Sequence, residues 1–221
     1  SEVPERSVIQ GVTFLLQNIY DYLLLWSLFS IWLVMLINNV LVTGGFFCYM
    51  KHTGKNKPLI PEDDLPFVSV LIPAHNEAKV IGKTVEAILE SDYAKEKYEI
   101  IVINDNSSDN SAEILERIKA EHPGRMLTII NTDSITGGKG KSNALNIGLA
   151  QSKGSLIAIY DADNTPEKSA LRELVYSIMN DSKAGAVIGK FRCRNRNRNL
   201  LTRFINIEGI YFQWMAQAGR W

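Results

Sequence analysis

The sequence predicts an α/β fold, a mostly parallel β-sheet with helices on both faces, preceded by one transmembrane helix. Two observations support this prediction. From residue 67 onward, short apolar runs alternate with segments of helical periodicity, which is the pattern of β-α-β units with right-handed crossovers. Before them, residues 22–50 carry no charged side chain. A helix of that length covers about 40 Å, more than the roughly 30 Å hydrocarbon core of a bilayer.

The charges that flank residues 22–50 predict how this helix is oriented. Acidic residues dominate before it and basic residues follow it: Glu2, Glu5 and Asp21, then Lys51, Lys55 and Lys57. Because basic residues collect on the cytoplasmic side, we expect the N-terminus outside the cell membrane and the remainder in the cytoplasm. A cleaved signal peptide would be shorter and would follow a basic segment. Residues 1–21 are expected to form a lead-in segment, and the proline-containing residues 51–66 a linker.

The elements of the main domain, residues 67–199, follow from periodicity. Strands are expected at residues 67–73, 98–103, 126–131, 156–160 and 184–193, and helices at residues 80–91, 112–120, 141–151 and 165–179. Asn110 with Glu113 predicts a capping box for the second helix, and Pro166 in the first turn predicts the start of the fourth. Residues 200–221 are expected to form an amphipathic helix at the acceptor side or the membrane surface, with a plain core helix as the alternative.

Composition narrows the class of function. The 221 residues include 24 basic and 24 acidic side chains, so no net field favours a nucleic-acid partner. The only cysteines are Cys48 and Cys193, which suggest neither a disulfide framework nor a zinc-ligand cluster. The polar junctions that follow the strands are therefore where chemistry is expected, because in a parallel sheet they gather along one edge.

The clearest of these junctions is Asp161-Ala162-Asp163, which ends the apolar run of the fourth strand. Two carboxylates so close together repel each other unless a cation or hydrogen-bond donors compensate them. Carboxylates suit a hard divalent ion that also binds a diphosphate. The sequence therefore predicts a site for Mg²⁺ or Mn²⁺ and a metal-bound nucleotide. The alternative is a solvated turn in which both aspartates cap the next helix.

Taken together, four junctions resemble those of the family-2 glycosyltransferases, which have the GT-A fold, a Rossmann-like fold that binds nucleotide-diphosphate sugars. The family patterns are Pro-Ala-x-Asn-Glu, Asp-Asp-Gly-Ser-x-Asp, Gly-Lys-x-x-Ala-Leu-Asn and Asp-x-Asp. The matching segments are Pro73-Ala74-His75-Asn76-Glu77, Asn104-Asp105-Asn106-Ser107-Ser108-Asp109, Gly138-Lys139-Gly140 with Ala144-Leu145-Asn146, and Asp161-Ala162-Asp163. The chain departs from the patterns at Asn104, at Asn106 and by an extra residue or two after Lys139. The resemblance covers about residues 66–215 and extends to membrane-bound processive β-polysaccharide synthases such as poly-N-acetylglucosamine synthase.

The resemblance implies roles for the matched residues. The residues expected around the UDP-sugar are Pro73, Ala74, Asn76, Glu77, Asp105, Lys139 and Asp161, and those expected to bind the metal are Asp161 and Asp163. Within this set, Asp105 would meet the uracil edge and Lys139 the diphosphate. The alternatives are a turn-forming aspartate and a solvated lysine. His75 is expected to be a spacer rather than a catalytic base, and Asp109 a helix-start residue rather than a ligand.

The function implied by the resemblance is metal-dependent, inverting transfer of a sugar from a UDP-sugar to a growing polysaccharide or a lipid-linked acceptor. In the family, an aspartate of a later Glu-Asp segment is the general base. No catalytic residue is therefore assigned in this chain, and the base is expected beyond Trp221, in the remainder of a larger enzyme. The competing hypothesis is a non-catalytic nucleotide-sugar-binding or assembly subunit that works beside an active partner.

Overall fold

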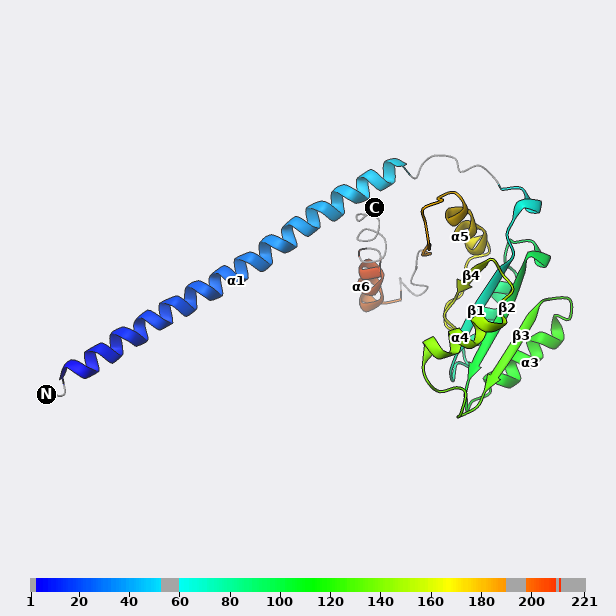
Figure 1. The fold of residues 1–221 in the computed structure, drawn as a ribbon, viewed down its shortest axis with the longest axis horizontal. Coiled ribbons are helices and arrows are strands. Elements are labelled where there is room, and N and C mark those ends of the chain that lie inside the picture. The colour runs from blue at the N-terminus through cyan, green and yellow to red at the C-terminus, as the bar shows by residue number, and fades with distance from the viewer. Residues whose placement is uncertain (1–2, 53–59, 190–197, 210, 212–221) are drawn as a thin grey trace. The chain divides into compact units, whose positions relative to one another are not determined.

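The computed structural model describes residues 3–52, 60–189, 198–209 and 211 (Figure 1). The chain divides into two compact units. Pro58–Gly189 form one unit, and Ser1–Lys57 with Lys190–Trp221 form the other. The first of these units contains the β-sheet, and the second contains the long N-terminal helix.

The sheet has four strands, all paired in parallel, in the order β3-β2-β1-β4 (Figure 1). The strands are β1 (Val68–Ala74), β2 (Tyr98–Asp105), β3 (Leu127–Thr132) and β4 (Leu156–Ile159). The helices of this unit are α2 (Ile81–Leu89), α3 (Ser111–Glu121), α4 (Lys141–Gln151) and α5 (Ala170–Met179). Short 3₁₀ turns lie at Glu62–Asp64 and Lys95–Lys97. The predicted parallel α/β architecture is confirmed.

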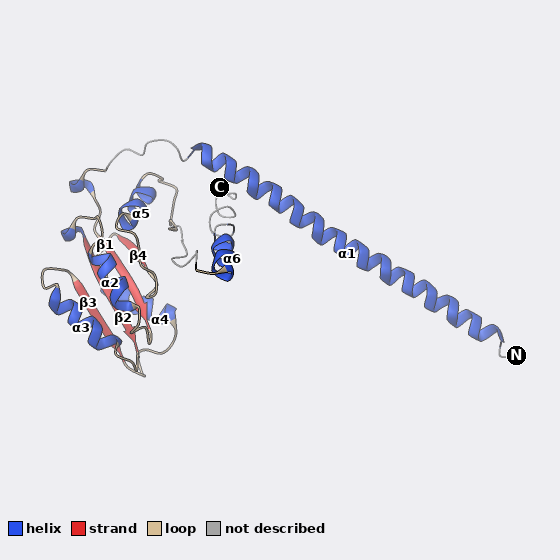
Figure 2. Ribbon diagram, turned by 180° about the vertical axis from the view of Figure 1, so that it is seen from behind, coloured by secondary structure: helices blue, strands red, loops and turns tan. Residues whose placement is uncertain are grey.

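The two faces of the sheet are covered unequally. On one face, α2, α3 and α5 contribute Val85, Leu115 and Leu171 to a large core, and Figure 2 shows α2 and α3 in front of the strands. On the other face, α4 packs on a much smaller cluster that includes Ile101 and Ile103. β4 alternates accordingly, because alternate side chains of a strand point to opposite faces. Leu156 and Ala158 pack against the large core, whereas Ile157 and Ile159 are 39% and 54% exposed.

One predicted helix boundary and one predicted capping box are wrong. The helix expected from residue 165 begins only at Ala170. The carbonyl of Lys168 instead accepts hydrogen bonds from the Asp92 N–H (2.7 Å) and the Ser91 hydroxyl (3.3 Å). This tertiary contact holds the preceding residues out of the helix. The capping box is also absent, because the Asn110 side chain makes no capping hydrogen bond.

The predicted fifth strand is not found in the part of it that the structure describes. Residues 184–189 are irregular, and residues 190–193 lie outside the described residues. Gly185 and Gly189 interrupt the apolar run, and Ile188 is 77% exposed. Strand propensity depends on packing against neighbouring strands, and glycine weakens it further. An apolar run of this kind is therefore insufficient to form a strand unless a neighbouring strand pairs with it.

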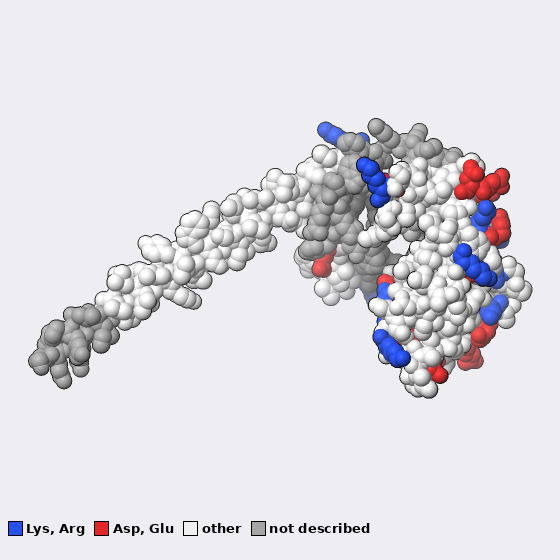
Figure 3. All heavy atoms as spheres, in the orientation of Figure 1, with Lys and Arg blue, Asp and Glu red and all other residues white. Residues whose placement is uncertain are grey.

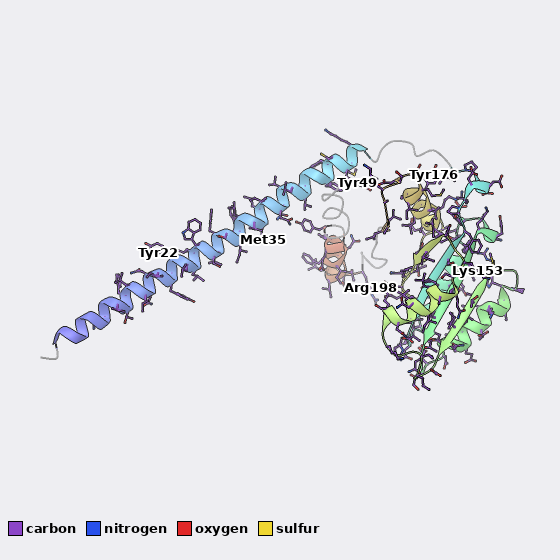
Figure 4. The ribbon with its side chains drawn as sticks, viewed as in Figure 1. Tyr22, Met35, Tyr49, Lys153, Tyr176 and Arg198 are labelled. Atoms are coloured by element: carbon purple, nitrogen blue, oxygen red, sulfur yellow. The ribbon has the colours of Figure 1, made fainter. Side chains whose placement is uncertain are left out.

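The N-terminal helix α1 (Val3–His52) is 50 residues long and runs without a break across the boundary expected at residue 21. Its segment Gln10–Lys51 is long and apolar enough to cross a membrane. From Gln10 onward the face of α1 seen in Figure 3 is almost entirely uncharged, and its apolar side chains, such as Tyr22 and Met35, project from the helix (Figure 4). This exposure makes α1 a candidate membrane span.

Three polar side chains inside this apolar segment form hydrogen bonds within the helix itself. Asn18, Ser30 and Asn39 each donate a hydrogen bond to the carbonyl four residues earlier, at 3.0, 2.7 and 2.8 Å. Such bonds lower the cost of polar groups within hydrocarbon. Asn39 also accepts a hydrogen bond from the hydroxyl of Tyr211, a residue that follows α6 (Leu200–Gly209). Tyr211 therefore contacts α1.

Candidate functional site

The candidate site lies at the carboxyl ends of the strands. β1, β2 and β3 follow one another across the sheet, and the chain then returns to place β4 on the other side of β1. Ligands of open α/β sheets bind in the crevice at such a switch in strand order. The described residues with positive φ all lie in loops at this edge: Asn76 (55°), Asn106 (51°), Gly138 (69°) and Gly140 (93°). Positive φ is unfavourable for the two asparagines, and such strained residues collect at functional sites.

The loops after β1 and β2 are joined by Asn76. Its N–H donates to the Ser107 hydroxyl (3.0 Å), and its Oδ1 accepts from the Ser108 N–H (2.8 Å). Its Nδ2 donates to His75 Nε2 (3.0 Å), while His75 Nδ1 donates to the carbonyl of Asp105 (2.6 Å). A carbonyl can only accept, so the Nδ1 atom of His75 is the donor in this hydrogen bond. His75 thus bridges the two loops, whereas only a spacer within its own turn was expected.

The remaining residues expected after β1 differ in their accessibility. Pro73 and Ala74 lie in the strand itself and pair with Ile103 and Asn104 of β2. Ala74 is buried, so its methyl group shapes the core rather than facing a ligand. Glu77 is partly exposed and lines an open hollow of about 530 Å³ that Asn76, Asp109 and Asn110 also line.

Asp105 holds a glycine loop in place. Its Oδ1 accepts hydrogen bonds from the Gly138 N–H and the Thr132 hydroxyl, both at 2.9 Å. A Cβ atom on Gly137 would lie 2.0 Å from Thr132 Oγ1 and 2.4 Å from Asp105 Oδ1, so any other residue there would displace these side chains. The Oδ1 atom of Asp105 thus fixes the position of this loop. Lys139, in the same loop, is exposed and makes no ion pair among the described residues.

Residues 161–164, here called the aspartate turn, follow β4. The turn is closed by a hydrogen bond from the Asn164 N–H to the Asp161 carbonyl (3.0 Å). Ala162 is buried in the core, whereas Asp161 is half-exposed and Asp163 exposed. α5 begins only at Ala170, so the alternative in which both aspartates cap that helix is wrong. The Lys141 ammonium group pairs with Asp161 Oδ1.

The carboxylates of the aspartate turn fit a divalent ion that the ligand helps to bind. Within the described ranges, no group of three or more His, Cys, Asp or Glu residues is placed to hold a metal. Asp161 and Asp163 therefore supply at most two ligating side chains. Mg²⁺ is often held by one or two carboxylates together with substrate phosphates and water. The donor set on this turn matches that arrangement.

Comparison with known proteins identifies the family. Residues 69–218 match the sequence profile of the family described as "Glycosyl transferase family 2". The chain belongs to this family. It is 51% identical over 197 residues to the probable glycosyltransferase YdaM of Bacillus subtilis. The aligned region covers 88% of this chain and 46% of the relative. It is 32% identical over 171 residues to poly-beta-1,6-N-acetyl-D-glucosamine synthase of Staphylococcus aureus, which covers 76% of this chain and 39% of the relative.

A solved structure supports the GT-A fold of this family-2 chain. Mannosyltransferase PcManGT from Pyrobaculum calidifontis, in complex with GDP-Man and Mn²⁺, aligns with a TM-score of 0.57 and 27% sequence identity. The alignment covers 73% of this chain and 46% of that one. The chain thus spans less than half the length of the relatives it matches.

The family pattern also identifies a residue that the sequence prediction missed. Gly140-Lys141-Ser142-Asn143-Ala144-Leu145-Asn146 fits Gly-Lys-x-x-Ala-Leu-Asn without any insertion. The match centred on Lys139 required extra residues. The structure brings Lys141, and not Lys139, to Asp161. Spacing alone was the signal that could have identified Lys141.

Two further aspartates fix the loops around the site. The Ser111 hydroxyl and the Ala78 N–H lower the pKa of Asp109 below its ordinary value. Its Oδ1 accepts from the Ser111 N–H (3.0 Å) and its Oδ2 from the Ala78 N–H (2.9 Å), so Asp109 starts α3, as expected. The Thr136 N–H lowers the pKa of Asp133 in the same way. Asp133 closes the loop between β3 and α4.

Proposed function

We propose that this chain is the donor-binding part of a metal-dependent glycosyltransferase. It would transfer a sugar from a UDP-sugar, with inversion, to a growing polysaccharide or a lipid-linked acceptor. The observation that carries the proposal is the aspartate turn, whose carboxylates stand at the switch in strand order with Lys141 beside them. The similarity to poly-beta-1,6-N-acetyl-D-glucosamine synthase supports a polysaccharide product.

Within this proposal each charged group has a task. Asp161 and Asp163 would hold Mg²⁺ or Mn²⁺, and PcManGT, solved with Mn²⁺, supports a divalent ion. When bound, the ion offsets the charge that develops on the leaving UDP. The Lys141 ammonium group, paired with Asp161 in this structure, lies within reach of the diphosphate and would balance part of its charge.

The uridine would lie across the loops after β1 and β2. Pro73 and Ala74 would support this part of the site from β1, Asn76 would shape the loop that follows, and Glu77 and Asp105 would hydrogen-bond the nucleoside. Lys139 stands exposed on the glycine loop, from which it could approach the diphosphate. The choice of UDP rests on the family resemblance of these loops, since PcManGT was solved with GDP-Man.

The acceptor and its activation involve more than this chain. We place the general base outside residues 1–221, because the chain spans less than half of its relatives. The alternative function, a non-catalytic nucleotide-sugar-binding subunit, makes a different prediction. It would bind UDP-sugar without turnover, both in this chain and in any longer parent chain.

The proposed function is tested by metal-dependent binding. Calorimetry on the detergent-solubilised chain should detect UDP binding that requires Mn²⁺. Asp163→Ala should abolish that binding, because one of two carboxylate ligands is lost. Glu116→Ala is the matched control, since Glu116 is an exposed carboxylate on α3 outside the site. Equal binding of UDP in the presence of a chelator, or by Asp163→Ala, would contradict the proposal.

We also propose that residues 22–50 span the cell membrane with the N-terminus outside and the sheet-containing unit in the cytoplasm. The basic residues after the span support this orientation. Single cysteines introduced by Ser7→Cys and Ser134→Cys, in a background with Cys48 and Cys193 replaced by serine, report the two sides. A membrane-impermeant maleimide on intact cells should label only the first. Labelling of only the second cysteine would show that the orientation is the reverse of the one proposed.

A further inference from the structure

We propose that Thr84 of α2 is a positioning residue for the aspartate turn and that it sets the metal affinity of the site. This inference deepens the proposed function and rests on it. Thr84 belongs to none of the four segments that carry the family resemblance. Its side chain reaches the turn from a helix 78 residues earlier in the chain.

The contact is short and fully buried. Thr84 has no exposed surface, and its hydroxyl donates to the carbonyl of Ala162 at 2.8 Å. A buried threonine in a helix often donates instead to the carbonyl four residues earlier. Here that carbonyl, of Val80, lies 3.5 Å from the hydroxyl, so the Ala162 carbonyl is the better acceptor.

The Ala162 carbonyl determines how the turn presents its carboxylates. Ala162 stands between Asp161 and Asp163, with its side chain in the core. Its carbonyl belongs to the peptide group that leads into Asp163, so the direction of this oxygen fixes the backbone at Asp163. A buried carbonyl without a donor is costly and tends to rotate toward water. Without the Thr84 hydroxyl, this peptide group would lose its fixed orientation.

The same helix also contacts the other side of the site. The Val80 and Ile81 N–H groups donate to the carbonyl of Glu77 at 3.0 and 2.9 Å. α2 therefore starts from the loop after β1 and, one turn later, holds the loop after β4. Thr84 thus fixes the aspartate turn relative to the loop expected to bind the nucleoside.

The sequence context of Thr84 favours this role over simple packing. On the inner face of α2, Thr84 lies among Ile81, Val85 and Ile88, all of them buried. A hydroxyl in such a stripe is unfavourable unless it is hydrogen-bonded. Valine has nearly the same shape, so packing alone would be satisfied without the oxygen atom.

The test compares three variants in the full chain. Thr84→Val removes the hydroxyl and keeps the shape, Thr84→Ser keeps the hydroxyl, and Val85→Ala weakens the packing of the same helix while leaving the hydrogen bond to Ala162 in place. Calorimetry measures Mn²⁺-dependent binding of UDP. Hydrogen exchange of the metal-free protein, read at residues 160–165, reports the order of the turn without any ligand.

Thr84→Val should weaken Mn²⁺-dependent UDP binding by about 10- to 100-fold, the usual effect of losing a group that orients a metal ligand. It should also speed exchange at the turn, and Thr84→Ser should restore both properties. Val85→Ala should lower the melting temperature and leave binding unchanged. Unchanged binding in Thr84→Val, or an equal loss in Val85→Ala, would overturn the inference.

These outcomes are separable from the failure of the proposed function. If Asp163→Ala loses metal-dependent binding and Thr84→Val does not, only the role of Thr84 is wrong. If Asp163→Ala binds like the unmodified chain, the metal site itself is wrong, and the inference is overturned with it.

Discussion

Strand β2 places one buried acid at each of its ends, on the same face of the sheet. Glu99, at the amino end, is 5% exposed, and Asp105, at the carboxyl end, is 6% exposed. Each holds a loop next to α4. Glu99 Oε1 accepts from the Lys153 N–H (2.7 Å), just after the helix, and Asp105 Oδ1 accepts from the Gly138 N–H, just before it.

The two acids differ in what surrounds them. Around Glu99 the partners satisfy one another, since the Ser69 hydroxyl donates to Glu99 (2.6 Å) and accepts from the Gly154 N–H (2.8 Å). The carboxyl end instead carries positive-φ residues and buried polar atoms without a partner in the described structure, namely Asn104 Oδ1 and the Tyr160 hydroxyl. The same kind of contact thus belongs to a closed hydrogen-bond network at one end and lies beside positive-φ loop backbone at the other, where the site lies.

The largest effect is expected at the amino end, from Gly154→Ala. A Cβ atom there would lie 2.4 Å from the Ser69 backbone nitrogen and 2.8 Å from the Leu156 carbonyl oxygen. Because backbone cannot move aside as a side chain can, we expect the free energy of unfolding to fall by about 3 kcal/mol. Urea denaturation measures this loss. Weaker UDP binding in the molecules that remain folded would show that the two ends are not independent.

Gly137→Ala, at the carboxyl end, should impair ligand binding more than folding stability. Its Cβ atom would meet the side chains of Thr132 and Asp105, which can move, so the loop shifts while the fold survives. We expect Mn²⁺-dependent UDP binding to weaken about tenfold, which corresponds to about 1.4 kcal/mol. The loss of folding stability should be smaller than for Gly154→Ala. Calorimetry and urea denaturation on both variants test this order, and the reverse order would refute the comparison.

Tyr160→Phe should be neutral or should stabilise the protein by up to about 1 kcal/mol, because it removes a buried hydroxyl that has no partner. Burial raises the pKa of Tyr160 to about 12, so the phenol carries no charge at neutral pH. Tyr98→Phe is the matched control, since the Tyr98 hydroxyl donates to the Ile88 carbonyl (2.9 Å) and its loss should destabilise. Thermal melting distinguishes the two. A destabilisation of equal size in both variants would mean that the Tyr160 hydroxyl is paired.

The smallest effect is expected from Asp109, as a dependence of stability on pH. Since hydrogen bonds lower the pKa of its carboxyl group from the ordinary value of 3.8, the folded state favours the carboxylate. The stabilisation is therefore complete above about pH 4 and is lost as the pH falls through the lowered pKa. Asp109→Asn should flatten this acid limb in urea denaturation curves between pH 3 and pH 6. An unchanged acid limb would assign the dependence to other carboxyl groups.

Most of the fold was predictable because its elements are marked locally. The strands and helices of the sheet-containing unit follow from apolar periodicity, and Asp161 with Asp163 could be placed at a strand end for the same reason. The position of these carboxylates at the edge of a parallel sheet then followed from topology. The strands were predicted to within two residues at each end, apart from the fifth, which was predicted at residues 184–193.

The predictions that failed concern positions whose structure depends on contacts between residues far apart in the sequence. α5 starts late because Lys168 bonds to residues 91 and 92, which no local pattern reveals. The capping box predicted at Asn110 is absent, and Asp109, the expected helix-start residue, instead makes hydrogen bonds to Ser111 and to Ala78. The hydrogen bond from Thr84 to Ala162 joins residues 78 apart, so only the folded chain reveals it.

The outer edge of β4 has a practical consequence for biochemistry on this protein. In the described part of the chain β4 pairs only with β1, so free backbone N–H and C=O groups lie beside the exposed Ile157 and Ile159. Such an edge can template β-pairing between copies. Deleting the apolar helix α1 to obtain a soluble fragment would leave this sheet edge exposed. The fragment should therefore aggregate as it is concentrated. A lysine at position 159 is the solubilising substitution to try first.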